Sequence, residues 1–201
     1  MRKAALATCL IALASTAGAA DMSVMVDRSE RGVEIFIKLD TERTEELLAP
    51  FPDDFVGGDG LVDIGPFRDG TADHGDALWQ AVETRIEGTA STVEAMSMMV
   101  HPDSLPVDFD DPIDGWIAMA VCNVTDPDAR FGLDVLSTYA GFIAWDVEGH
   151  GEVEIAFPTA MEVEVTEFLE GREISSAVLQ VSDAAPLRLD AVSRWERWRF
   201  W

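Results

Sequence analysis

The sequence predicts a mainly β protein, an antiparallel sandwich or a partly open barrel with one or two short helices near the N-terminus; an α+β fold is the alternative. Short segments in which apolar and polar residues alternate recur along most of the chain. Clusters of Gly, Pro, Asp and Ser separate these segments. Because a period of two places apolar side chains on one face of a strand, this pattern is typical of sheets with one buried face.

The clearest strand is predicted over residues 32–39. Apolar residues occupy every second position from Val33 to Leu39, with Glu34 and Lys38 between them. Residues 22–26 form a second apolar segment, and Glu30, Arg31 and Gly32 provide a turn between the two. A hairpin is therefore expected at the start of this region.

Two short helices are expected before residue 90. Residues 41–49 follow the potential cap Asp40 and end before Pro50. A second helix is predicted over 77–87, where Leu78, Val82 and Ile86 share one helical face. The region between them, 50–76, is dense in Gly, Pro and Asp and has no period, so we expect a long loop. Loops of this length are often functional or mobile.

From residue 91 onward, strand signals dominate. Turn signals separate the segments, and the most regular alternation lies in the two that follow Gly151. The predicted strands cover residues 92–100, 116–122, 131–147, 152–157, 160–169, 172–181 and 187–201.

Residues 1–20 have the three parts of a cleavable secretory signal peptide. Arg2 and Lys3 form a positive start, an apolar stretch follows, and small residues precede Asp21. The apolar stretch is shorter than the roughly 20 residues that span a bilayer. We therefore expect a periplasmic or secreted protein whose mature part is a single soluble domain over 21–201, without stable membrane insertion.

The chain is strongly acidic. It contains 14 Lys and Arg against 38 Asp and Glu, a net charge of −24, and loss of Arg2 and Lys3 with residues 1–20 would make it −26. Such a surface repels phosphate backbones and anionic lipid, so nucleic acid is excluded as a partner, whereas a basic protein surface is attracted. The hydrophobic fraction of 48% is too high for a disordered polyanion.

Only Cys122 remains after removal of residues 1–20, which contain Cys9. A single cysteine allows no intrachain disulfide in an exported protein, so the core must be stable without one. We expect Cys122 to be a small buried apolar residue on a strand.

Met96, Met98 and His101 are a candidate copper site. Thioether and imidazole groups are ligands that copper accepts, and Cu(I) favours sulfur. An ordinary strand would direct Met96 and Met98 to one face and His101 to the other, which weakens convergence on one ion. The alternative is core methionines and a histidine in a loop.

The C-terminal segment is the one basic, aromatic stretch of this acidic chain. Tryptophan and arginine dominate the binding energy of protein interfaces. The alternative is a final strand whose aromatic rings close the core. The residues that we predict to contact a partner are Trp195, Arg197, Trp198 and Trp201.

Catalytic motifs are absent from the sequence. It has no G-x-S-x-G, H-E-x-x-H, phosphate-binding loop or C-x-x-C pattern. Asp73 and His74 are adjacent, and the carboxylate would orient the imidazole as a general base if a nucleophile lay nearby in the fold.

These observations predict an exported binding or accessory protein of the cell envelope, without catalytic activity or a cofactor. It would contact a protein partner through the C-terminal Trp/Arg segment or the 50–76 loop. A periplasmic copper-binding protein is the alternative, and a hydrolase with an unrecognised site ranks third.

Overall fold

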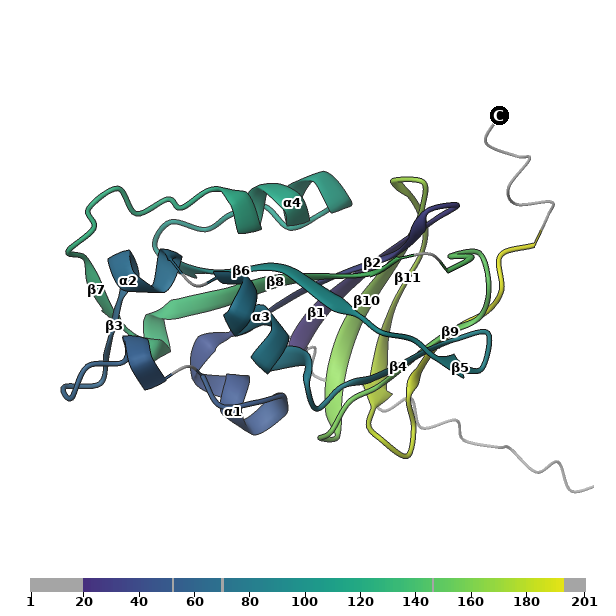
Figure 1. The fold of residues 1–201 in the computed structure, drawn as a ribbon, viewed down its shortest axis with the longest axis horizontal. Coiled ribbons are helices and arrows are strands. Elements are labelled where there is room, and N and C mark those ends of the chain that lie inside the picture. The colour runs from purple at the N-terminus through teal and green to yellow at the C-terminus, as the bar shows by residue number, and fades with distance from the viewer. Residues whose placement is uncertain (1–19, 52, 70, 146, 194–201) are drawn as a thin grey trace, which may run out of the picture.

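A computed structural model describes residues 20–51, 53–69, 71–145 and 147–193 (Figure 1). The predicted mainly β class is confirmed: the described chain forms several open sheets with a few short helices. The signal-peptide prediction falls on residues 1–20 and so lies, apart from residue 20, outside the described residues.

A six-stranded sheet organises the fold, with the strand order β11-β10-β1-β2-β8-β6. Neighbouring strands of this sheet are antiparallel, except that β1 and β10 run parallel. The strands are β1 (Met22–Ser29), β2 (Gly32–Asp40), β6 (Glu94–Pro102), β8 (Leu136–Trp145), β10 (Met161–Leu169) and β11 (Arg172–Val181).

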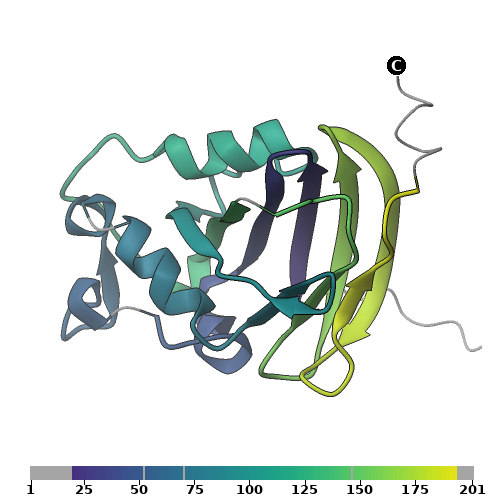
Figure 2. The same cartoon turned by 45° about the vertical axis from the view of Figure 1, so that its right-hand side comes forward.

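A four-stranded sheet, in the order β12-β9-β4-β5, faces part of the first (Figure 2). Side chains of both sheets, such as Val24 and Ile155, belong to one buried cluster, so the two form a sandwich. We call the face that carries Val24 the inner face of the six-stranded sheet and the opposite one the outer face. The smaller sheets consist of β4 (Glu83–Ile86), β5 (Thr89–Ala90), β9 (Val153–Ala156) and β12 (Leu187–Leu189), and of the pair β3 (Leu61–Asp63) with β7 (Arg130–Gly132).

Helix α4 (Pro112–Ala120) lies on the outer face, where Met119 packs with Met25, Phe36 and Phe168. The helix α3 (Thr71–Trp79) packs beside β6. The remaining helical turns are η1 (Thr41–Arg43), α1 (Thr44–Leu47), η2 (Asp53–Phe55), α2 (Ile64–Arg68) and η3 (Leu133–Val135).

The first hairpin and helix follow the sequence pattern. In β2, the side chains of Val33, Ile35, Ile37 and Leu39 are buried in the main core, as the alternation predicts. Residues 41–47 form the helical turns expected there. The local pattern and the tertiary structure agree in this region.

The helix predicted over 77–87 is wrong. Helix α3 ends at Trp79, and residues 83–86 form the strand β4. Val82, Thr84 and Ile86 are buried while the residues between them are exposed, which is a period of two. Glu87 and Gly88 both have positive φ, 51° and 73°, as a tight hairpin turn to β5 requires.

The strand predicted over 116–122 is also wrong, because residues 112–120 form helix α4. The side chain of Asp111 accepts hydrogen bonds from the backbone N–H groups of Ile113 (2.8 Å) and Asp114 (2.9 Å), and Pro112 takes the first helical position. An N-cap aspartate followed by proline is a helix-start signal. Cys122 follows this helix, half-buried and not in a strand.

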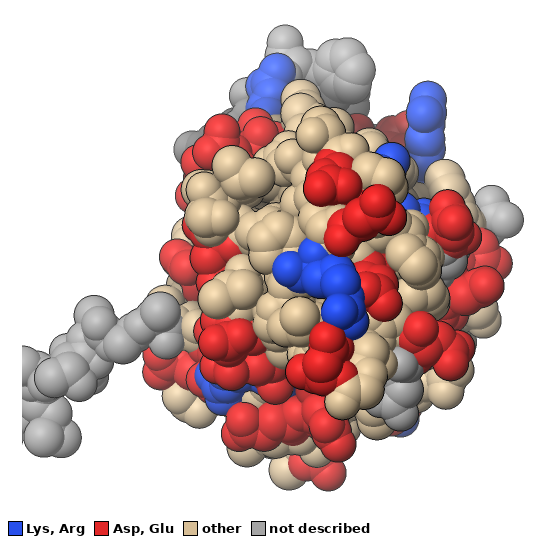
Figure 3. Space-filling model, turned by 90° about the vertical axis from the view of Figure 1, so that its left-hand side faces the viewer, with Lys and Arg blue, Asp and Glu red and all other residues tan. Residues whose placement is uncertain are grey.

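The region 50–76 is not one long loop. It contains η2, β3, α2 and the start of α3, and Val62, Ile64 and Phe67 are buried in the main core. The guanidinium of Arg130 on β7 pairs with Asp59 (2.8 Å) and Asp63 (2.5 Å) of this region. Figure 3 shows basic side chains in the middle of this face, surrounded by acidic ones. Apolar anchors and ion pairs therefore order a segment that its Gly and Asp content had suggested to be irregular.

Among the described residues, no helix combines the length and apolar character needed to cross a bilayer.

Candidate functional site

Strand β11 forms one edge of the six-stranded sheet. It pairs with β10 on one side, and no described strand pairs with its other side. Almost every side chain of β11 is exposed, including Val178 (58%) and Leu179 (37%), which are adjacent and therefore point to opposite faces. As far as the described residues are concerned, this strand is thus accessible along its unpaired backbone edge and on both faces.

The sequence of β11 gives its edge little protection. After Arg172 and Glu173, the strand continues as ISSAVLQV from Ile174 to Val181, without charge or proline. In an antiparallel pair, alternate backbone N–H and C=O groups of an edge strand face outward and lack a partner strand. Proteins usually shield such an edge with lysine, proline, a bulge or a covering element. The register of β11 with β10 is irregular at Ile174 and continuous from Ser175 to Val181. A long uncharged edge is a template for a further strand.

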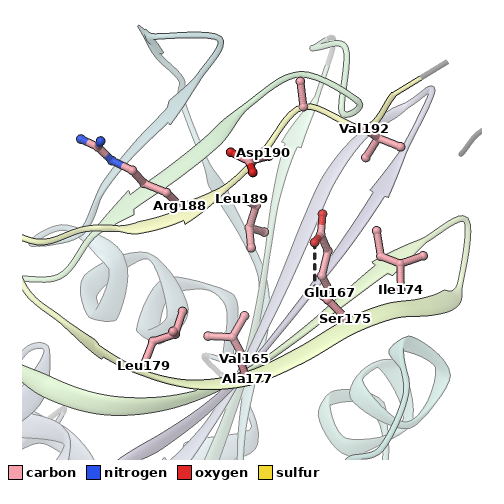
Figure 4. Close-up of a pocket in the computed structure, with 11 residues that line it drawn as sticks. Val165, Glu167, Ile174, Ser175, Ala177, Leu179, Arg188, Leu189, Asp190 and Val192 are labelled. Atoms are coloured by element: carbon pink, nitrogen blue, oxygen red, sulfur yellow. Dashed lines mark hydrogen bonds between the residues drawn. The ribbon is translucent and has the colours of Figure 1, made fainter. Parts of the chain in front are cut away.

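A cleft of about 290 Å³ lies against the inner face of β10 and β11 (Figure 4). Its other wall is β12 and the residues that follow it, from which Leu189 points toward Val165 and Leu179 while Arg188 points away. Its apolar lining consists of Val165, Ile174, Ala177, Leu179, Leu189 and Val192.

Arg28 lies behind this cleft with no exposed surface. Its Nε donates to Gly149 O (2.8 Å), Nη1 donates to Asp190 O (2.7 Å), and Nη2 donates to Gly151 O. One side chain thereby joins β1, the turn before β9 and the chain after β12. These contacts fix the wall that faces β11.

Glu167 of β10 compensates the buried charge of Arg28. Its Oε1 lies 2.5 Å from Nη1 of Arg28, and its Oε2 accepts a hydrogen bond from Ser175 Oγ (3.1 Å; Figure 4). A buried ion pair of this kind costs several kcal/mol if either partner is removed. Because both carboxylate oxygens have partners, Glu167 is a structural group at the floor of the cleft.

The surroundings of β11 are mainly acidic. On the outer face, the exposed Glu164 lies opposite Val178 in the register, and Glu162 accepts a hydrogen bond from Gln180 (3.0 Å). On the other wall, Arg188 pairs with Glu154 (3.0 Å). A ligand with positive charge is therefore favoured on the outer side of the strand.

The opposite edge of the same sheet, β6, is covered by α3. Asp76 Oδ1 accepts a hydrogen bond from Ala95 N (3.0 Å), and the hydroxyls of Thr71 and Ser97 are 3.2 Å apart. Gly75 is buried against β6, and a Cβ there would lie 2.8 Å from the Cβ of Ala95. Side chains of α3 thus occupy this edge in place of a partner strand.

The C-terminal residues predicted to contact a partner, Trp195, Arg197, Trp198 and Trp201, lie outside the described residues. Val192, which lines the cleft, is two residues before the start of that segment. Partner binding by these residues stays a prediction.

The structure does not bring the three predicted copper ligands to one face. An irregularity in the pairing of β6 between Ala95 and Ser97 makes Met96 an extra residue, which packs with the outer-face cluster. Met98 is fully buried in the main core on the inner face. Copper binding stays a prediction, which titration with Cu(I) against a competing chelator checks.

His101 is buried beneath α4. Its Nε2 lies 2.7 Å from Ala118 O, its ring meets Tyr139 edge-on, and its Nδ1 has no hydrogen-bond partner among the described residues. Burial lowers the pKa of this imidazole, although the bond to Ala118 opposes the shift. His101 thus lies in the packing between β6 and α4.

His74, the candidate general base, lies in α3 and packs against Phe55 and Phe67, with ring centroids 4.5 Å and 5.2 Å away. Burial lowers its pKa, while Asp73 and Asp54 partly offset the shift. Its Nε2 is buried without a hydrogen-bond partner in the described part of the chain. The imidazole therefore belongs to an aromatic cluster under α3.

Sequence reasoning predicted β11 as a strand but did not identify it as a site. The available signal was the long uncharged segment from Ile174 to Val181, which lacks the alternation seen in β2 and β10. A strand with neither alternation nor a continuous large apolar face has no face dedicated to the core.

No group of three or more His, Cys, Asp or Glu side chains within the described ranges is arranged to hold a metal ion. Comparison with known proteins finds no family model that matches the chain and no significant sequence match among curated proteins.

Proposed function

We propose that this protein binds an extended segment of another polypeptide, which adds to β11 as a further strand of the six-stranded sheet. The observation that carries this proposal is the uncovered, uncharged edge from Ile174 to Val181 beside an apolar cleft. In strand addition, main-chain hydrogen bonds supply affinity and pockets for alternate side chains supply specificity. The signal-peptide pattern of residues 1–20 supports binding outside the cytoplasm.

The cleft limits the side chains that such a segment carries on its inner face. Ala177 and Leu179 of β11 line the cleft opposite Leu189, so apolar residues are favoured on the inner face of the segment. The outer face presents Glu164 and Glu162, which favour lysine or arginine at the alternate positions. The expected ligand is an extended segment in which apolar and basic residues alternate.

The net charge of the chain explains how an open edge is tolerated. At −24, two copies repel one another, so pairing of β11 with β11 is opposed. A basic segment has no such barrier and is attracted. The same charge therefore disfavours self-association and favours the proposed ligand.

A direct test uses a short fluorescent peptide of alternating valine and lysine, measured by fluorescence polarisation with the full chain. We expect saturable binding that weakens as salt is added. The matched control peptide has the same side chains but N-methyl groups on its backbone nitrogens, which remove its N–H donors. Equal binding of the two peptides would show electrostatic adsorption and contradict strand addition.

Two variants locate the site. Val178→Lys places a charge on the edge and should lower the affinity about tenfold, or 1.4 kcal/mol. Val135→Lys, at an exposed apolar residue in η3, changes the net charge equally and should leave the affinity within about twofold of the parent value. If both variants weaken binding to the same extent, the peptide does not bind at β11.

A further inference from the structure

Helix α4 exposes an apolar stripe, one member of which, Trp116, also meets Phe36 of the outer face edge-on. Ile113, Trp116, Ile117 and Val121 are between 44% and 69% exposed. They occupy positions i, i+3, i+4 and i+8, so they form one face of the helix and continue past its end. Soluble proteins seldom leave a contiguous apolar face of this kind without a use for it.

The stripe lies in an acidic environment. Residues 100–129 contain seven aspartates and neither lysine nor arginine. Trp116 Nε1 donates to Glu34 Oε2 (3.2 Å), and Glu34 pairs in register with Asp27 on the same outer face. Burial, with repulsion from Glu34 and Glu170, raises the pKa of Asp27 although Gly171 N donates to it. A ligand that combines apolar rings with positive charge suits this surface.

We propose that the stripe on α4 is the seat of the chain's own C-terminal segment, residues 194–201. This segment, RWERWRFW, contains three arginines and four aromatic rings in eight residues. Its tryptophans would cover Ile113 and Ile117, and its arginines would lie beside Glu34 and Asp27. Because aromatic and arginine side chains dominate interface energies, the composition of the segment matches the stripe.

The described chain ends close enough for this contact. Val192 N donates to His150 O (2.8 Å), and the adjacent Gly149 lies against Gly32 at the start of β2. Glu34, which accepts the hydrogen bond from Trp116, is two residues after Gly32 in β2, so the Cα atoms of Gly32 and Glu34 are about 6–7 Å apart. Eight extended residues span up to about 29 Å, so the segment can follow this route.

An exposed tryptophan lies on the same route. Trp145 pairs in register with Gly32 and is 54% exposed. Its neighbour Ala144 belongs to the inner core, so alternation directs Trp145 to the outer face, which also carries α4. Helix α4 lies across that face in both ribbon views (Figures 1 and 2). Trp145 and the stripe on α4 are therefore exposed apolar groups on the same side of the six-stranded sheet.

The test measures thiol labelling of the full chain with Cys9→Ser and Cys122→Ser, so that only an introduced cysteine reacts. The probe Ile117→Cys lies on the stripe, and the control Val178→Cys lies on β11. Replacing Trp195, Trp198 and Trp201 by serine should raise the labelling rate at position 117 about tenfold or more, because the covered fraction falls. The rate at position 178 should not change.

Three results would overturn the proposal. The labelling rate at 117 stays the same after the tryptophan substitutions; the rate at 178 rises instead; or protection of 117 falls on dilution, which would assign the contact to a second copy. The three cysteine probes replace the exposed side chains of Ile113, Ile117 and Val178. Ile113→Cys repeats the measurement at a second position on the stripe, and circular dichroism of every variant checks that the fold is retained.

Discussion

The two edges of the six-stranded sheet differ in what protects their backbones. At β6, helix α3 contributes Asp76 and Thr71 as polar partners and places Gly75 directly against the strand. At β11, the described chain provides no covering element, and the strand itself lacks charge beyond its first two residues. One sheet thus has a sealed edge and an open edge. The sealed edge shows that this fold is able to cover a strand, which makes the open one the better candidate for binding.

The largest expected effect concerns the ion pair behind the open edge. Arg28→Met leaves Glu167 buried without its cation and should reduce the free energy of unfolding by about 3–5 kcal/mol, measured by urea denaturation. Hydrogen exchange should rise first around β12 and residues 149–151, which Arg28 joins.

The double variant Arg28→Met, Glu167→Leu removes the unpaired charge and should recover part of this loss. A loss below about 1 kcal/mol in the single variant would show that the pair does not hold the cleft wall.

Opening the sealed edge should have the next largest effect. Gly75→Val forces α3 away from Ala95 and should cost about 1–3 kcal/mol of stability, seen in thermal unfolding. It also exposes β6, so the valine–lysine peptide should gain a second binding site. Gly58→Val is the matched control, since a Cβ at Gly58 meets no atom within 4 Å. If Gly75→Val adds no binding site, edge exposure alone does not create one.

Added salt should have a smaller effect, which is weak self-association through the open edge at β11. Raising the ionic strength to about 1 M shortens the screening length to about 3 Å and removes the repulsion between copies. Analytical ultracentrifugation should then show weak self-association, which Val178→Lys prevents and Val135→Lys does not. Self-association that is insensitive to Val178→Lys would place the contact away from β11.

Lowering the pH should have the smallest effect on stability, and it should act through one histidine in α3 and one in β6. His74 in α3 and His101 in β6 both have a pKa lowered by burial from the ordinary 6.5. As the pH falls, these histidines are therefore protonated in the unfolded chain at a higher pH than in the folded chain. The stability that the two neutral histidines contribute is complete above about pH 6.5 and is lost as the pH falls below it. Unfolding free energies measured between pH 7 and 5 should show this slope.

His101→Gln isolates that contribution, because its amide can still donate to Ala118 O but does not titrate in this range. Its slope should be smaller than that of the parent chain. Equal slopes would show that the protonation of His101 is not coupled to folding.

The sequence was informative where local pattern and tertiary role agree. The alternation in β2 and β10 predicted strands with one buried face, and Asp40 with Pro50 bracketed the first helical turns. It was misleading where two periods overlap: Leu78, Val82 and Ile86 fit a helical face, yet Val82 and Ile86 also fit the strand alternation that is observed. The capping pair Asp111 and Pro112 was the missed signal for α4.

The candidate site could not be predicted from local sequence patterns. Residues 172–181 were predicted as a strand, but their place at an edge follows from the pairing of β10 with β1, far away in the sequence. The irregularity at Met96, which separates it from Met98, also depends on pairing with β8. Strand order and register are long-range properties, so the open edge required the structure.

Amide hydrogen exchange, read residue by residue with and without the valine–lysine peptide, tests the open edge most directly. In the free protein, the outward-facing amides of β11 should exchange quickly and those of β6 slowly. The peptide should protect alternate amides between Ile174 and Val181 and leave β6 unchanged. Protection elsewhere, with β11 still exchanging freely, would contradict strand addition at this edge.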